Sequence, residues 1–269
     1  VKGIRKGYTG LINGEIIDMT ARSVSDILHR GGTILQTSRS KEFRHQEGVL
    51  RGAQMAKVFG IDGLIVIGGD GSFRGARDLC SAGLPTIGIP GTIDNDISCT
   101  EYCIGFDTAL NTVKDAIDKI RDTSNSHERS SIVEVMGRDA GYIALSVGIS
   151  CGAEVVLVPE HKHTFEEDVL RPIMEAKNRG KTHYLIIVAE GVGGSVQLAE
   201  KIEECTGIET RATILGYIQR GGSPTVTDRL VASEMGGYAV DLLLKGIGNR
   251  LVVQKNNRIT DVDITEGLA

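Results

Sequence analysis

The sequence lacks three features that would each indicate a particular class of protein. Positive charge is not in excess: the net charge is −5 at pH 7 and the pI about 5.7, so we expect no nucleic-acid partner. No run of about 18 apolar residues and no signal-like N-terminus is present, so we expect a soluble cytoplasmic protein with no membrane partner. The five cysteines have no zinc-binding spacing, and their odd number and wide scatter suit reduced thiols.

Glycine, in contrast, is abundant. The chain has 35 glycines among 269 residues, well above the usual ~7%, and they cluster in short loops. The length suits one large α/β domain or two smaller ones, and either can bury a real core. The loops therefore become the first place to look for function.

Short apolar runs alternate with amphipathic helical patterns along the chain. Continuous apolar runs bounded by turn residues are typical of parallel strands covered on both faces. Such runs occupy residues 63–67, 86–89, 131–136, 155–158 and 184–188, and helical stripes occupy 106–120, 165–173 and 231–242. The alternation predicts βαβ units and a mostly parallel sheet, in which ligands bind at the carboxyl ends of the strands.

The first loop after a predicted strand is Gly68-Gly69-Asp70-Gly71-Ser72. Its glycines allow backbone N–H groups to approach a phosphate, and the following helix N-terminus favours negative charge. Asp70 would then hold Mg²⁺, which takes one or two carboxylates together with phosphate oxygens. The alternative interpretation is a tight turn in which Ser72 caps the helix.

The second loop contains "PGTIDND", with Thr92, Asp94 and Asp96 at alternating positions. On extended backbone these three side chains would point the same way, where they could bind a sugar hydroxyl and remove its proton. The alternative is a network of Asx turns. We expect the two loops to follow neighbouring strands, which favours a shared site.

Four arginines lie beside turn glycines or predicted strand ends: Arg129, Arg138, Arg211 and Arg220. Guanidinium groups suit phosphate binding, although any one of them alone is more typical of a solvated surface. Arginines held in loops of a net-acidic chain fit a phosphorylated small molecule better than a polyanion.

The motifs "GGDGS", "PGTIDND", "VMGRDAG", "AEG", "ETRAT" and "IQRGGSP", in this order and at these separations, resemble those of bacterial ATP-dependent 6-phosphofructokinases. The resemblance extends from "GYTGL" at Gly7 to the end of the chain. "GGDG" alone is weak, because lipid and NAD kinases carry similar loops, whereas "PGTIDND" together with "IQRGGSP" is highly specific. The resemblance implies transfer of the γ-phosphoryl group of ATP to the 1-hydroxyl of fructose 6-phosphate, with Mg²⁺.

The resemblance also implies a role for individual residues. Asp94 is similar to the general base, Thr92 and Asp96 line the same site, and Arg138 resembles the residue that stabilises the transferring phosphoryl group. Asp70 resembles the Mg²⁺ ligand. The implied nucleotide contacts are Gly69, Gly71 and Ser72, with Tyr8, Arg39 and Ser40 nearby. The implied sugar-phosphate contacts are Met136, Gly137, Glu190 and Arg220, with Arg129 and Arg211 reaching into a neighbouring subunit's site.

The resemblance further implies a fold, an assembly and an effector site. The fold is two Rossmann-like three-layer α/β/α domains with mostly parallel sheets. Residues 1–105 plus about 219–269 would bind the nucleotide, and about 106–218 the sugar phosphate. A homotetramer is implied, with an inter-subunit effector site for ADP or phosphoenolpyruvate at Arg121, Gly152, Glu154, Arg179 and Lys181.

Two glycines bear on the phosphoryl donor. In pyrophosphate-using relatives an Asp occupies the position of Gly71, and a Lys precedes "TIDND" at the position of Gly91. A carboxylate at position 71 would crowd the phosphates of bound ATP, so we predict ATP as the donor.

The sequence departs from the family pattern at three places. An N-terminal strand and glycine loop are expected before Val1, and the family's usual last helix is expected after the final "ITEGLA". Tyr217 stands where a histidine usually contacts the sugar phosphate; a tyrosine hydroxyl can donate to phosphate but carries no charge. A non-catalytic fragment that binds sugar phosphate or effector, and another kinase with a "GGDG" loop, therefore stay open as alternatives.

Overall fold

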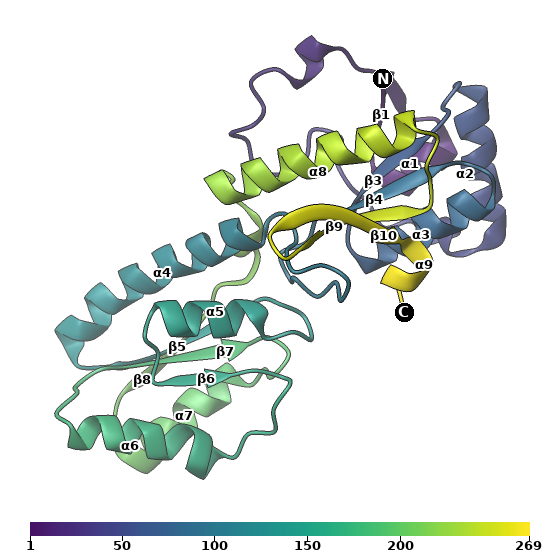
Figure 1. Cartoon of the computed structure of the whole chain (residues 1–269). Coiled ribbons are helices and arrows are strands. Elements are labelled where there is room, and N and C mark those ends of the chain that lie inside the picture. Colours follow the sequence, from purple (N-terminus) through teal and green to yellow (C-terminus); the bar gives the residue numbers. More distant parts are fainter. The chain divides into compact units, whose positions relative to one another are not determined.

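The computed structural model describes residues 1–124 and 126–269 with their side chains, and the chain divides into two compact units. Unit 1 contains Val1–Thr92, Ile97–Gly105 and Ser223–Ala269, and unit 2 contains Ile93–Asp96 and Phe106–Gly222. Both units are α/β layers around mostly parallel sheets, which confirms the predicted fold class (Figure 1). The assignment of the nucleotide to one unit and of the sugar phosphate to the other stays a prediction.

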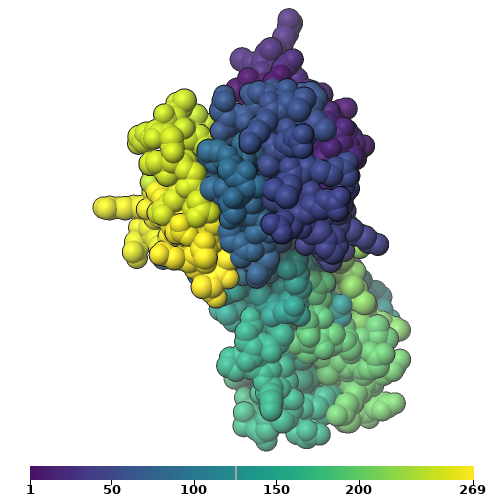
Figure 2. All heavy atoms as spheres, turned by 90° about the vertical axis from the view of Figure 1, so that its right-hand side faces the viewer, coloured from purple at the N-terminus to yellow at the C-terminus, as the bar shows by residue number. Residues whose placement is uncertain are grey.

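Unit 1 is built around a four-stranded sheet in the order β10-β9-β4-β3. Strands β3 (Leu64–Gly68), β4 (Thr86–Pro90) and β9 (Arg250–Lys255) are parallel, and β10 (Arg258–Asp263) is antiparallel to β9. In Figure 2 the yellow C-terminal residues lie against the blue part of the chain that holds β4, so the sheet joins segments far apart in sequence. A separate antiparallel pair is formed by β1 (Lys2–Ile4) and β2 (Ile16–Asp18).

Helices cover both faces of the unit 1 sheet. On one face Phe73 and Ala76 of α3 pack with Leu251 and Val253, and on the other Met235 of α8 packs in a cluster with further strand residues. The helices of this unit are α1 (Gly7–Asn13), α2 (Gln46–Val58), α3 (Asp70–Ser81), α8 (Val226–Leu244), α9 (Ile264–Gly267) and the 3₁₀ turns η1 (Ala21–Val24) and η2 (Glu42–Arg44).

Unit 2 has an all-parallel sheet in the order β6-β7-β5-β8. Alternate residues of its strands face opposite helices: Val133 packs with α4 and α5, and its neighbour Ile132 packs with α6 and α7. The elements are α4 (Phe106–His127), β5 (Ser130–Val135), α5 (Tyr142–Ser150), β6 (Val155–Leu157), η3 (Phe165–Leu170), α6 (Arg171–Asn178), β7 (Tyr184–Ala189), α7 (Ser195–Thr206), β8 (Thr210–Ile214) and η4 (Gly216–Arg220).

The helical stripe predicted over residues 165–173 is not one α-helix. Phe165–Leu170 winds as a π-helix, and α6 begins at Arg171. Pro172 gives the physical reason, because proline has no N–H to donate and its ring clashes with the carbonyl four residues earlier. No helix among residues 1–124 and 126–269 combines the length and the apolar character needed to cross a bilayer.

Asp228 ties together two places where the chain passes between the units. Its carboxylate is buried and accepts hydrogen bonds from the Tyr102 hydroxyl and the Gly105 N–H, both at 2.7 Å. Gly105 is the last residue before the chain enters unit 2, and Asp228 lies in the first turn of α8, just after the chain returns at Ser223. The side chain of Thr225 caps that helix by accepting from the Asp228 N–H.

We expect Asp228→Ala to lower the free energy of unfolding by about 2 to 4 kcal/mol, because it removes the buried, charged acceptor of a half-buried Tyr102 hydroxyl and of the Gly105 N–H. Urea denaturation followed by circular dichroism measures the loss. Asp241→Ala, at an exposed position of the same helix, is the control and should change stability by less than about 0.5 kcal/mol. Equal stability of the two variants would contradict the anchoring role.

Candidate active site

The glycine loop leads directly into α3. Gly69 is the N-cap residue and the helix begins at Asp70, so Ser72 is the third helical residue and the interpretation of Ser72 as the cap is wrong. The first backbone N–H groups of a helix have no acceptor within it, and they face negative charge favourably. A β-carbon placed on Gly71 would meet no atom within 4 Å, so the first turn of the helix is open to a ligand at this residue.

Tyr8 links α1 to this loop. Its hydroxyl donates to the Ser72 carbonyl, and its ring stacks on Phe43 with centroids 4.0 Å apart. Ser40 joins the same group, since its hydroxyl accepts from the Phe43 N–H at 3.2 Å, and Arg39 is exposed beside it. Burial, assisted by the charge of Asp78, raises the pKa of Tyr8, so the hydroxyl stays a neutral donor.

Asp70 is the carboxylate of the glycine loop. It is about half exposed and forms an ion pair with Arg74 one turn later, with a shortest N–O distance of 2.9 Å. Residues 1–124 and 126–269 contain no group of three or more metal-ligating side chains. A single carboxylate fits Mg²⁺ held largely by phosphate oxygens and water, and it does not fit a metal held by protein alone.

The two loops follow neighbouring strands, as predicted. Strands β3 and β4 are parallel neighbours whose last residues, Gly68 and Pro90, are paired. The Gly91 N–H donates to the Gly68 carbonyl at 2.9 Å, and a β-carbon on Gly69 would lie 3.8 Å from that of Thr92. Thr92 is therefore at the glycine loop, and the next four residues belong to unit 2.

Asp94 and Asp96 face one guanidinium group. The Nη2 atom of Arg138 lies 3.7 Å from Asp94 Oδ2, and its Nη1 atom lies 3.5 Å from Asp96 Oδ2. The predicted extended backbone is wrong here, because Asn95 has a φ of 53°, in the left-handed region. The two carboxylates meet Arg138 through this turn and not through simple alternation along a strand.

The loop after β5 is held by two side chains from elsewhere in unit 2. Glu190 Oε1 accepts from the Gly137 N–H at 3.1 Å and from the Arg138 N–H at 2.6 Å, and this fixes Arg138 at its positive φ of 55°. The Met136 N–H donates to Oε1 of Gln219 at 3.0 Å. Gln219 is buried, and its place between the predicted Tyr217 and Arg220 is the only sequence signal that could have identified it.

Asp94 is the buried carboxyl group of the site. Only 9% of the residue is exposed, and burial, followed by the charge of Asp96, raises the pKa of its carboxyl group. Arg138 opposes this rise, and Arg220 does so more weakly. Tyr217 is 78% exposed, and the Arg220 guanidinium lies over its ring at 4.8 Å from the centroid.

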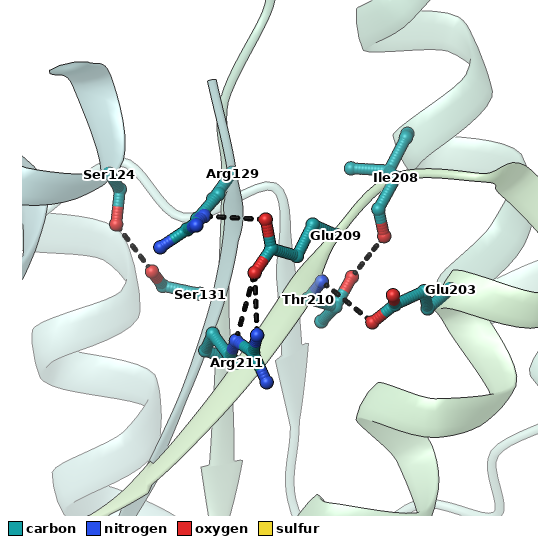
Figure 3. A network of polar contacts seen from close by, with 8 residues as sticks. All are labelled: Ser124, Arg129, Ser131, Glu203, Ile208, Glu209, Thr210 and Arg211. Carbon is teal, nitrogen blue, oxygen red and sulfur yellow. Dashed lines mark hydrogen bonds and ion pairs between the residues drawn. The ribbon is translucent and has the colours of Figure 1, made fainter. Parts of the chain in front are cut away.

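Arg129 and Arg211 are not in this group. They lie at the amino ends of β5 and β8, whereas Arg138 follows the carboxyl end of β5, and the six residues of that strand span about 20 Å. Arg211 lies on a strand and not in a loop as predicted. Both arginines contact Glu209 (Figure 3).

Three of the predicted effector residues lie just before the amino ends of unit 2 strands: Gly152 and Glu154 precede β6, and Lys181 precedes β7. Glu154 forms an ion pair with Lys181 and accepts from the Leu185 N–H at 2.8 Å. Arg121 donates to the carbonyls of Cys151 and Gly152, and its buried Nε atom has no hydrogen-bond partner in the described part of the chain. Arg179 is exposed at the end of α6.

Comparison with known proteins gives consistent matches. A family model described as phosphofructokinase matches residues 1–243. The ATP-dependent 6-phosphofructokinase of Clostridium acetobutylicum is 60% identical over all 269 residues, which cover 84% of that protein, and one from Clostridium botulinum is 57% identical over the same share. The phosphofructokinase structure from Saccharomyces cerevisiae matches with a TM-score of 0.91 and 32% identity, over 100% of this chain and 41% of that one.

We expect the charges around Asp94 to control its titration. Asp96→Asn should lower the pKa of Asp94 because it removes a neighbouring negative charge, and Arg138→Gln should raise it because it removes a positive one. The carboxyl ¹³C shift of Asp94, followed against pH, measures both changes. Shifts of the same sign in the two variants would contradict this electrostatic account.

Proposed function

Because the chain belongs to the phosphofructokinase family, we propose that it transfers the γ-phosphoryl group of MgATP to the 1-hydroxyl of fructose 6-phosphate, giving fructose 1,6-bisphosphate and ADP. The observation that carries the proposal is the group formed by Asp94, Asp96 and Arg138. It begins two residues after Thr92, which lies at the glycine loop.

Asp94 acts as the general base. Its burial and the adjacent charge of Asp96 raise its pKa, which makes the carboxylate a stronger base than one in water. Arg138 and Arg220 limit the rise, which favours the ionised form that accepts a proton. General-base assistance is commonly worth about 10² to 10⁴ in rate.

Arg138 stabilises the charge on the transferring phosphoryl group. Phosphoryl transfer depends mainly on in-line positioning and on cations at the equatorial oxygens. The guanidinium of Arg138 is held between Asp94 and Asp96 at distances longer than a hydrogen bond, so its N–H groups remain able to reach a phosphoryl oxygen. Glu190 fixes the backbone from which this side chain extends.

The nucleotide binds at the carboxyl edge of the unit 1 sheet. Gly69 and Gly71 offer backbone N–H groups to its phosphates and Ser72 offers its hydroxyl, because the Ser72 N–H already donates to the Gly69 carbonyl. Asp70 would hold Mg²⁺. When bound, the ion neutralises charge on the phosphate oxygens. Tyr8, Ser40 and Arg39 complete this half of the site; the first two are fixed through Phe43 and Ser72.

Two glycines support ATP as the donor. The open space at Gly71 would be occupied by an aspartate side chain. A β-carbon at Gly91 would lie 2.9 Å from Ile67 Cγ2, so a lysine there would require Ile67 to move.

The sugar phosphate is bound by two copies of the chain. Met136, Gly137, Glu190, Tyr217 and Arg220 belong with Asp94, whereas Arg129 and Arg211 lie at the opposite ends of their strands. One copy therefore supplies the first set, and a neighbour supplies the two arginines. The exposed apolar stripe on α5, formed by Tyr142, Leu145 and Ile149, supports association, and we infer a homotetramer.

An effector site is part of the same proposal. Arg121, Gly152, Glu154, Arg179 and Lys181 would bind ADP or phosphoenolpyruvate, both of which carry phosphate. The cationic side chains of Arg121, Arg179 and Lys181 supply the positive charge that a phosphate ligand requires. On the same proposal the protein is located in the cytoplasm, where the substrates of glycolysis are found.

We expect the purified chain to phosphorylate fructose 6-phosphate with ATP, and Asp94→Ser to lower kcat by about 10² to 10⁴ while changing KM for the sugar far less. An assay that couples fructose 1,6-bisphosphate formation to NADH oxidation measures both parameters. Glu200→Gln, an exposed substitution on α7, is the control.

Three results would count against parts of this account. A near-normal kcat in Asp94→Ser would show that Asp94 is not the general base. Activity with pyrophosphate and none with ATP would overturn the donor. Binding of fructose 6-phosphate without turnover would favour a non-catalytic sugar-phosphate binder.

Mixed oligomers test the sharing of sites. At fructose 6-phosphate concentrations far below the KM of the Arg211 variant, Asp94→Ser and Arg211→Ala are each expected to be nearly inactive alone. Co-expressed copies should recover about a quarter of wild-type activity, because random pairing unites an intact Asp94 with a neighbour's intact Arg211. The control mixes Asp94→Ser with Arg138→Ala. These two residues lie on the same copy, so no mixture completes a site, and recovery there would contradict the division.

A further inference from the structure

Glu209 bridges the two arginines at the amino edge of the unit 2 sheet. Its Oε2 atom accepts from Arg129 Nε at 2.6 Å, and its Oε1 atom accepts from Arg211 Nε at 3.1 Å and Nη2 at 2.6 Å (Figure 3). Each carboxylate oxygen therefore holds a different guanidinium group. Hydrogen bonds from Arg211 and Arg129 lower the pKa of Glu209, so the bridge is ionised near neutral pH.

The bridge leaves donors available on both arginines. Arg129 uses only Nε, and its two Nη groups have no partner within the described residues. Arg211 uses Nε and one Nη group, which leaves the other for a ligand. Two guanidinium groups that repel one another are thus kept together, and several of their N–H groups remain able to donate hydrogen bonds. A phosphate dianion is bound by donors of this kind.

The backbone under Glu209 is fixed. Its carbonyl accepts from the Ser130 N–H at 2.9 Å, and the next residue, Thr210, is paired with Ser130 between β8 and β5. Beside these, the Ser124 and Ser131 hydroxyls form a buried pair at 2.5 Å (Figure 3). A carboxylate on a fixed backbone can impose its geometry on long side chains that would otherwise sample many rotamers.

We propose that Glu209 is a positioning residue that holds Arg129 and Arg211 as one preorganised clamp for the phosphate of the sugar bound by a neighbouring copy. The proposal rests on the proposed function, because that function supplies the sugar phosphate and the shared site. Preorganisation favours binding because the ordering of both side chains is completed before the ligand arrives. The opposing effect is that the carboxylate of Glu209 cancels one of the two positive charges and competes with the phosphate for the arginines. If positioning dominates, removal of the charge of Glu209 weakens binding of the sugar phosphate; if competition dominates, it strengthens binding.

The test compares Glu209→Gln with Glu203→Gln. The first variant keeps the size of the side chain but loses the ion pairs to both arginines, and the second changes a neighbouring carboxylate that contacts only backbone at Thr210 in Figure 3. We expect Glu209→Gln to raise KM for fructose 6-phosphate about tenfold or more, with kcat and KM for ATP within about twofold. Glu203→Gln should leave all three parameters within about twofold of wild type.

Coupling between the residues gives a second readout. In an Arg129→Gln/Arg211→Gln background, Glu209→Gln should cause no further rise in KM, because the groups it positions are already lost. An additive rise would overturn the proposal, as would an unchanged or lower KM in the single variant. A fall in oligomer mass by light scattering would assign Glu209 to assembly and would also overturn it.

Direct binding separates this inference from the proposed function. Calorimetric titration with fructose 6-phosphate should show binding to wild type and to Glu203→Gln, and about tenfold weaker binding to Glu209→Gln. Equal binding by all three chains would overturn only the role of Glu209. No binding by wild type would overturn the proposed function and, with it, the clamp.

Discussion

The parallel pairing of β3 with β4 is the constraint on which the rest of the proposed site depends. Because Gly68 is paired with Pro90, both strands end at the same level, and the glycine loop and the Gly91–Thr92 segment become neighbours. The helix that begins at Asp70 then directs its N-terminus towards this edge. A shift of β4 by one residue would place an isoleucine where Gly88 lies closely against Phe73 and Leu251, so packing fixes the register and the register fixes the loops.

Charge balance is the second constraint, and it acts within unit 2. Two carboxylates, Asp94 and Asp96, share one guanidinium group, and only Asp94 is deeply buried. Burial and like charge raise the pKa of Asp94, while Arg138 prevents the full cost of burying an unpaired charge. Glu190 and Gln219 contribute by holding the backbone that carries Arg138.

Much of this could be predicted from the sequence, and what could not has identifiable causes. The five short apolar runs became β3 to β7, because strands buried on both faces leave a continuous apolar signal. Strands β8 and β10 were missed because each mixes polar and apolar residues, and the antiparallel β10 follows a turn at Asn256 and Asn257. The turn at Asn95 and the bridge at Glu209 depend on partners distant in sequence, which no local pattern reports.

The common direction of the unit 2 strands determines which arginines can lie close together in one copy. Parallel strands place all their carboxyl ends at one edge and all their amino ends at the other, so Arg138 and Arg129, although only nine positions apart in the sequence, are separated by the length of β5. A single copy cannot bring both to one small sugar phosphate. If both act on the same ligand, association of copies is a condition of activity, and the amino edge must present its cations already arranged. Glu209 is the described residue whose contacts satisfy that requirement.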